Sequence, residues 1–165
     1  MRINQSVVVA APAETVWHYV EDPENYLRFM SGITHWEVVG DKANGLGARY
    51  RILVRVGAAE VGGLIEMVEW NEPFDIAWHS VTGVDHRGRW RIREQDKGRT
   101  KIEFRFAYGV VGGGPAGWLV EIAAAPAMRG QMRGTLRQLK RQVEQEQRRI
   151  ETERRRATRR RAAPA

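Results

Sequence analysis

Hydrophobic and polar residues alternate along most of the chain between residues 36 and 108, which is the pattern of strands that bury one face and expose the other. The clearest case is residues 100–108, where Ile102, Phe104, Phe106 and Tyr108 share one face. Similar strands are predicted at 36–39, 49–56, 61–70, 74–81 and 88–93. Because the connections between them are short, the strands are expected to form an antiparallel meander.

Another strand, 3–10, precedes this series, and two short helices follow it, opening at Pro12 and Pro23. A long C-terminal helix is predicted because apolar residues recur at helical spacings: Met128, Met132, Leu136, Leu139 and Val143. A kink or break is expected near Pro126. The fold class is therefore α+β, a curved antiparallel sheet wrapped around a long C-terminal helix, with two short helices after the first strand.

A curved sheet around a helix leaves a space that usually holds an apolar ligand. The side chains expected to line this space are those on the apolar face of each strand and of the helix. They are Tyr50, Ile52, Val54, Trp78, Trp90, Ile92, Phe104, Phe106, Tyr108, Trp118, Met128 and Met132. The two methionines would suit a ligand of irregular shape, although filling of the core is the simpler interpretation of each.

The net charge of +7 is concentrated at the C-terminus. Residues 148–165 contain eight arginines and two glutamates and so carry +6 of that charge. We therefore divide the chain into one domain, 1–147, and an arginine-rich tail, 148–165, which is expected to be frayed or disordered. The tail is either a solubilising extension or a contact for RNA, DNA or an anionic membrane.

The polar face of the predicted sheet is also basic. It carries Arg49, Arg51, Arg55, Arg89, Arg91, Arg93, Lys101 and Arg105. Sheets that bind RNA display aromatic side chains on the exposed face, whereas here the aromatic residues belong to the buried set. We therefore interpret this face as a solvated surface that opposes aggregation.

Several kinds of chemistry lack a recognisable motif. The chain has no cysteine, no apolar run long enough to span a membrane and no signal-peptide core, so a cytoplasmic protein is expected. The four histidines do not have metal-binding spacing, and no cofactor or metal site is expected. Glu66 and His79 would face each other across a hairpin, as a hydrogen-bonded pair or, alternatively, as an acid/base pair. No catalytic residue is identified.

The chain resembles the START-like (helix-grip, SRPBCC) superfamily, in particular the bacterial polyketide cyclase/dehydrase and lipid-transport family. The resemblance covers residues 2–145. It rests on Ala11-Pro12-Ala13-Glu14-Thr15-Val16-Trp17, Asp22-Pro23-Glu24-Asn25-Tyr26, Gly45-Leu46-Gly47-Ala48-Arg49-Tyr50, Glu69-Trp70-Asn71-Glu72-Pro73 and Gly98-Arg99-Thr100-Lys101-Ile102. It implies a helix-grip fold with a hydrophobic cavity for a lipid, polyketide, sterol or quinone-like molecule, and it carries no catalytic signature.

Three functions follow from these expectations. The first is binding or carriage of a small hydrophobic ligand between the sheet and the C-terminal helix. The second is an enzyme, a polyketide aromatase/cyclase or dehydrase. The third is an interaction module that docks on a ribosome, nucleic acid or anionic membrane through the arginine tail. A buried acid–His or Tyr–Arg pair in the cavity would favour the enzyme, and an apolar cavity would favour the carrier.

Overall fold

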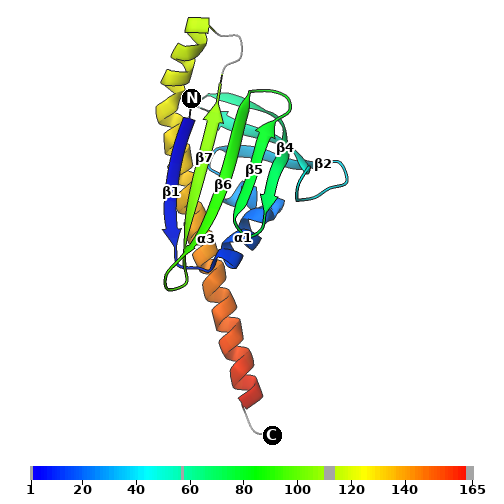
Figure 1. The fold of residues 1–165 in the computed structure, drawn as a ribbon, viewed down its shortest axis with the longest axis vertical. Helices are drawn as coiled ribbons and strands as arrows, with labels where there is room; N and C mark the ends of the chain where they lie inside the picture. Colours follow the sequence, from blue (N-terminus) through cyan, green and yellow to red (C-terminus); the bar gives the residue numbers. More distant parts are fainter. Residues whose placement is uncertain (1, 57, 110–113, 163–165) are drawn as a thin grey trace.

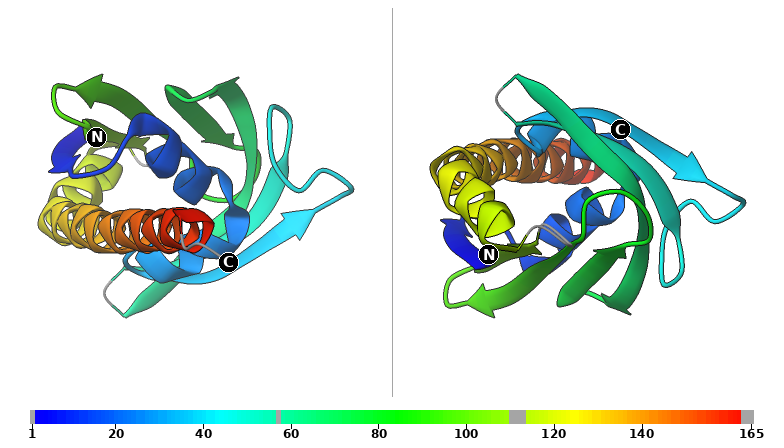
Figure 2. Two further views of the ribbon diagram at one scale, coloured as in Figure 1. Left: turned by 90° about the horizontal axis from the view of Figure 1, so that it is seen from below. Right: turned by 90° about the horizontal axis from the view of Figure 1, so that it is seen from above.

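The computed structural model describes residues 2–56, 58–109 and 114–162, with side chains except at positions 56, 59, 114–125 and 162. One seven-stranded sheet curves around a long helix, α3, in the order β1-β7-β6-β5-β4-β3-β2 (Figures 1 and 2). The strands are β1 Arg2–Val9, β2 Ile33–Val39, β3 Arg49–Val56, β4 Ala59–Asn71, β5 Asp75–Ser80, β6 His86–Gln95 and β7 Arg99–Tyr108. All neighbours pair antiparallel, which confirms the predicted meander.

Three short helical segments connect β1 to β2 and cover one end of the concave face: α1 Ala13–Glu21, η1 Pro23–Asn25 and α2 Tyr26–Phe29 (Figure 2). The Asp22 side chain caps η1 by accepting a hydrogen bond from the backbone N–H of Glu24. Trp17 of α1 is fully buried and packs edge-on against Trp70 of β4, with ring centroids 5.4 Å apart. These helices therefore fill the interior next to the sheet rather than lying at its edge.

The helix α3 runs from Gly114 to Ala162. Its predicted core face is confirmed in the part that follows Pro126, where Met132, Leu136, Leu139 and Val143 are buried. The helix continues through Pro126, and its N-terminal turns lie at an angle to the rest (Figure 2). The predicted bend is thus present without a break in the helix.

The arginine-rich tail differs from the expectation of a frayed or disordered segment, because α3 continues as a helix to Ala162 and projects beyond the sheet (Figure 1). Residues 148–162 contain no Gly or Pro and consist mainly of good helix formers. Arg149 also forms ion pairs one helical turn away with Glu146 and Glu153. The side chains from 151 to 161 are exposed, so this extension adds nothing to the hydrophobic core.

Two glycines of β4 lie very close to the backbone of neighbouring segments. A Cβ atom on Gly62 would collide with the carbonyl of Ile52, and one on Gly63 with the carbonyl of Thr82. Only glycine permits these close backbone approaches, which draw β3 and the β5–β6 connection toward β4.

Among the described helices, no stretch is long and apolar enough to cross a membrane.

Candidate functional site: a cavity between the sheet and α3

A cavity of about 430 Å³ lies between the concave face of the sheet and α3. Its wall is formed by the residues that follow α2, by strands β2 to β7, and by one face of α3. The lining residues are Met30, Ser31, Ile33, Trp36, Ile52, Val54, Val61, Gly62, Trp78, Val84, His86, Phe104, Phe106, Tyr108, Met128, Gln131, Met132 and Thr135. The cavity is therefore mostly apolar, with a few polar side chains in its wall.

Most of the residues predicted to line a cavity are found around this one. They are Ile52, Val54, Trp78, Phe104, Phe106, Tyr108, Met128 and Met132. The side chain of Trp118, which was also predicted to line the cavity, lies outside the described residues.

Tyr50, Trp90 and Ile92 were predicted to line the cavity, but the structure places them in the closed core. Trp90 and Ile92 are fully buried, and the Trp90 ring lies 6.0 Å from that of Phe29 in α2. The Tyr50 hydroxyl donates a 2.8 Å hydrogen bond to the carbonyl of Ala43. Alternation gave the correct face for all three residues, but α1 and α2 fill the part of the concave face in which they lie.

The interpretation of the sequence missed Trp36 and His86, which also line the cavity. His86 lies two residues before Gly88, the predicted start of its strand, on the face shared with Trp90. Trp36 is paired with Ile52, so it shares the face of that predicted lining residue. A prediction that began the sixth strand at residue 86 would have identified His86. A predicted register between the second and third strands would have identified Trp36.

Aromatic residues form a continuous wall on the β7 side of the cavity. Phe104, Phe106 and Tyr108 follow one another along the strand with ring centroids 6.2 and 6.0 Å apart. Trp78 of β5 joins them at 6.0 Å from Phe104. Its indole lies directly over Gly88 of β6, where a Cβ atom would overlap the ring. The wall is therefore aromatic and apolar on this side.

The sequence profile of polyketide cyclase/dehydrase and lipid transport proteins matches residues 1–144, which is nearly the whole folded domain. The chain belongs to this family. A comparison with curated proteins finds no match to the sequence.

Solved structures agree with the family in fold. The protein TTHA0849 from Thermus thermophilus superposes with a TM-score of 0.73 at 20% identity, over 87% of this chain and 97% of that one. The aromatase/cyclase ZhuI from Streptomyces sp. R1128 superposes with a TM-score of 0.68 at 23% identity, over 87% and 93%. A START superfamily protein from Mycobacterium smegmatis gives 0.67 at 18% identity, over 87% and 97%. These similarities confirm the helix-grip fold.

In this member of the polyketide cyclase/dehydrase and lipid transport family, His86 is a titratable residue in the cavity wall. Its Nδ1 lies 2.8 Å from the carbonyl oxygen of Val84, which can only accept, so Nδ1 carries the proton. Burial lowers the pKa of His86, opposed by the Val84 hydrogen bond and by the charge of Asp85. The neutral ring therefore keeps Nε2 as a hydrogen-bond acceptor.

Polar side chains of α3 that line the cavity form hydrogen bonds with other parts of the protein. The backbone N–H of Ser31 donates a 2.9 Å hydrogen bond to the hydroxyl of Thr135. The Gln131 side-chain amide donates to the carbonyl of Arg55. These contacts tie α3 to the α2–β2 segment and to the end of β3, and they hold the cavity wall together.

The described lining residues include no Asp, Glu, Lys or Arg. Neither of the charged pairs that would favour catalysis, acid–His or Tyr–Arg, is therefore found among them. Glu66 and His79 are paired across β4 and β5 as expected, but both lie on the exposed face, and the Glu66 carboxylate accepts from Arg49 at 2.7 Å. Within the described part of the chain no cluster of His, Asp or Glu could hold a metal ion.

Proposed function

We propose that this protein binds or carries a small hydrophobic molecule in the cavity between the sheet and α3. The observation that carries the proposal is the cavity itself, about 430 Å³ with a largely apolar and aromatic wall. Ligand sites of this size and composition are typical of proteins that enclose a small apolar molecule. The aromatic side formed by β7 suits a ring-containing ligand, such as a polyketide, sterol or quinone-like compound, as well as a lipid chain.

Carriage is favoured over catalysis because no charged side chain is found among the described lining residues. The alternative is an aromatase/cyclase activity, as in the name of ZhuI, or a dehydrase activity, as in the name of the family. His86 favours this second function, since a neutral histidine whose Nε2 has no hydrogen bond to a described residue is a suitable general base. The same Nε2 would accept a hydrogen bond from a hydroxyl group on a carried ligand.

The absence of cysteine from the sequence favours a cytoplasmic setting for either function.

Native mass spectrometry of the purified full chain tests the ligand-binding proposal. We expect a bound species that adds mass to the folded protein and is released on denaturation, or else binding of the neutral fluorophore N-phenyl-1-naphthylamine at micromolar concentration. A neutral probe is chosen because the many arginines would attract an anionic one. A folded protein with no added mass and no probe binding would contradict the proposal and indicate a solid core.

We also propose that the C-terminal extension of α3 contacts a polyanion. Five exposed arginines recur at spacings of four, seven, seven and four residues, so they share the side of the helix opposite Leu139 and Val143. They are Arg137, Arg141, Arg148, Arg155 and Arg159. None of the five forms an ion pair with another described residue. A continuous row of free guanidinium groups suits the phosphates of RNA or DNA, or the surface of an anionic membrane.

Deletion of residues 148–165 should leave the fold intact and weaken polyanion binding. The deleted side chains are largely exposed, so the melting temperature should change by less than about 3 °C. Affinity for RNA, DNA or anionic vesicles should fall at least about tenfold at low salt and converge with the wild type at high salt. Thermal denaturation and fluorescence anisotropy measure the two effects.

Replacement of Arg148, Arg155 and Arg159 with Gln is the matched control, because it removes charge but keeps the length of the helix. This variant should reproduce most of the loss of polyanion affinity. Undiminished binding after the deletion would make the extension only a solubilising segment, and unfolding would show that the domain boundary near residue 147 is wrong.

A further inference from the structure

The exposed face of the sheet is basic, and most of its arginines are neutralised by acids on neighbouring strands. Arg49 pairs with Glu66 at 2.7 Å and Arg51 with Glu37 at 2.9 Å. The carboxylate of Asp75, largely buried, accepts from both Arg91 and Arg93. On this part of the sheet the charges therefore alternate in sign, which is the pattern expected of a solvated surface.

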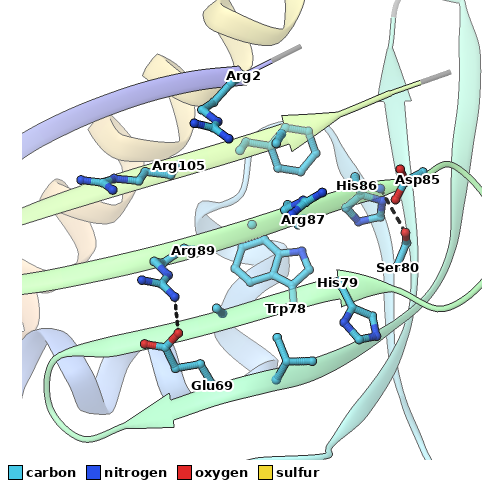
Figure 3. A pocket seen from close by; sticks show the side chains of 15 residues that line it. Arg2, Glu69, Trp78, His79, Ser80, Asp85, His86, Arg87, Arg89 and Arg105 are labelled. Carbon is cyan, nitrogen blue, oxygen red and sulfur yellow. Dashed lines mark hydrogen bonds and ion pairs between the residues drawn. The ribbon is translucent and has the colours of Figure 1, made fainter.

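One region of the same face departs from this pattern. Arg2 of β1, Arg87 and Arg89 of β6, and Arg105 of β7 surround a shallow depression of about 580 Å³ (Figure 3). The register explains the grouping, because Ala107 of β7 is paired with Arg2 on one side and with Arg87 on the other. Two residues further along these strands, and therefore on the same face, Arg105 is paired with Arg89. Four arginines from three adjacent strands thus line one depression, and two of them, Arg2 and Arg87, lie on either side of Ala107.

The acids near this depression do not balance its charge. Arg89 is paired with Glu69, and Arg105 shares Glu103 with Lys101. Arg2 and Arg87 form no ion pair with any described residue, and Asp85 is the other acid in the wall. Arg89 and Arg105 also face each other directly, and like charges opposite each other destabilise a sheet. Arg2 and Arg87 are therefore the two arginines of the depression whose charge a bound anion would neutralise.

Short side chains make room for such an anion. Ala77, which is buried, and Ala107 line the depression with short side chains, and the exposed His79 lies beside Arg87 in the next strand. Neighbouring strands are about 4.8 Å apart, so the Cα atoms of Arg2 and Arg87, on either side of β7, are separated by about 10 Å. Two long side chains spaced in this way reach a common ligand over the alanine without bending away from the surface.

We propose that this depression, defined by Arg2, Arg87, Arg89 and Arg105, binds a phosphate group, and a diphosphate in preference to a single one. Guanidinium groups form paired hydrogen bonds with phosphate oxygens. Several guanidinium groups that line one depression therefore suit an anion with more than one negative charge. The four arginines lie on the face of the sheet opposite the apolar cavity, and Trp78, His86 and Phe106 border both spaces. The proposal does not rest on the ligand proposed for that cavity. The phosphate belongs either to a soluble phosphorylated compound or to a lipid headgroup.

Isothermal titration calorimetry with inorganic pyrophosphate tests the site in the full chain. We expect wild-type binding at low salt that weakens at least about tenfold in Arg87→Gln and in Arg2→Gln, because each removes a charge-assisted contact. Arg49→Gln is the matched control, since it removes an arginine from the same face outside the depression and should bind as the wild type does. Equal melting temperatures among the variants confirm that each is folded.

Vesicles containing phosphatidic acid distinguish the two sources of phosphate. If Arg87→Gln binds the vesicles more weakly than Arg49→Gln does, the phosphate belongs to a lipid headgroup. If Arg87→Gln loses affinity for pyrophosphate but not for the vesicles, the phosphate belongs to a soluble compound. The arginine tail is present in every variant, so its contribution cancels in the comparison. No pyrophosphate binding by the wild type, or the same loss of affinity in Arg49→Gln as in Arg87→Gln, would overturn the proposal.

Discussion

Replacing Trp90 with alanine should destabilise the fold by about 3–5 kcal/mol, the usual cost of removing a large aromatic side chain from a core. Trp90 is fully buried, stacks on Phe104 with ring centroids 4.0 Å apart and contacts Phe29 of α2. Its loss would leave a void where β6, β7 and the short helices meet. Urea denaturation, followed by circular dichroism, measures the free energy of unfolding.

Phe74→Ala is the control for this prediction. Phe74 is also an aromatic residue of the sheet region, but 44% of its surface is exposed and its ring contacts Arg93 from the outside. Its removal should cost less than about 1 kcal/mol. If the two variants lost similar stability, the closed core around Trp90 would be described incorrectly.

Replacing Val54 with tryptophan should block the cavity while the domain stays folded. Val54 is half-buried in the cavity wall, so an indole there occupies space that a ligand would otherwise use. The affinity for N-phenyl-1-naphthylamine should fall at least about tenfold, which corresponds to about 1.4 kcal/mol. The measurement is a fluorescence titration, and the mass of any co-purified ligand should decrease in parallel.

Val81→Trp is the matched control, because it adds the same side chain at a position that is 44% exposed and does not line the cavity. Probe affinity in this variant should equal that of the wild type. Unchanged probe affinity in Val54→Trp, with the protein folded, would place the binding of the probe elsewhere on the molecule and contradict the proposed site.

The sequence alone predicted the strands and helices before the arginine tail, the antiparallel meander and, through the family resemblance, the helix-grip fold. Alternation along β7 identified Phe104 and Phe106 as inward-facing, and the spacing of Leu136, Leu139 and Val143 identified the core face of α3. These features are local, because the period of a strand or helix decides which face a side chain occupies. The family resemblance followed from such elements and their connecting turns.

Only the tertiary structure decided which inward-facing residues meet a cavity and which are enclosed. Tyr50 and Ile52 lie on the same face of β3, yet the first is packed in the closed core and the second lines the cavity. The difference comes from α1 and α2, which cover one end of the concave face and leave the other end open to α3. Periodicity carries no information about where a distant helix will pack.

The same reason applies to the arginine site and to the bulge in β4. Arg2 and Arg87 are 85 residues apart in the sequence and flank Ala107 only because β1 pairs with β7 in one particular register. In β4 the pairing with β5 shifts between Met67 and Glu69, which leaves Val68 exposed within a strand that otherwise alternates. A sequence pattern gives the face of each residue, whereas the register between strands and the packing of distant helices decide its neighbours.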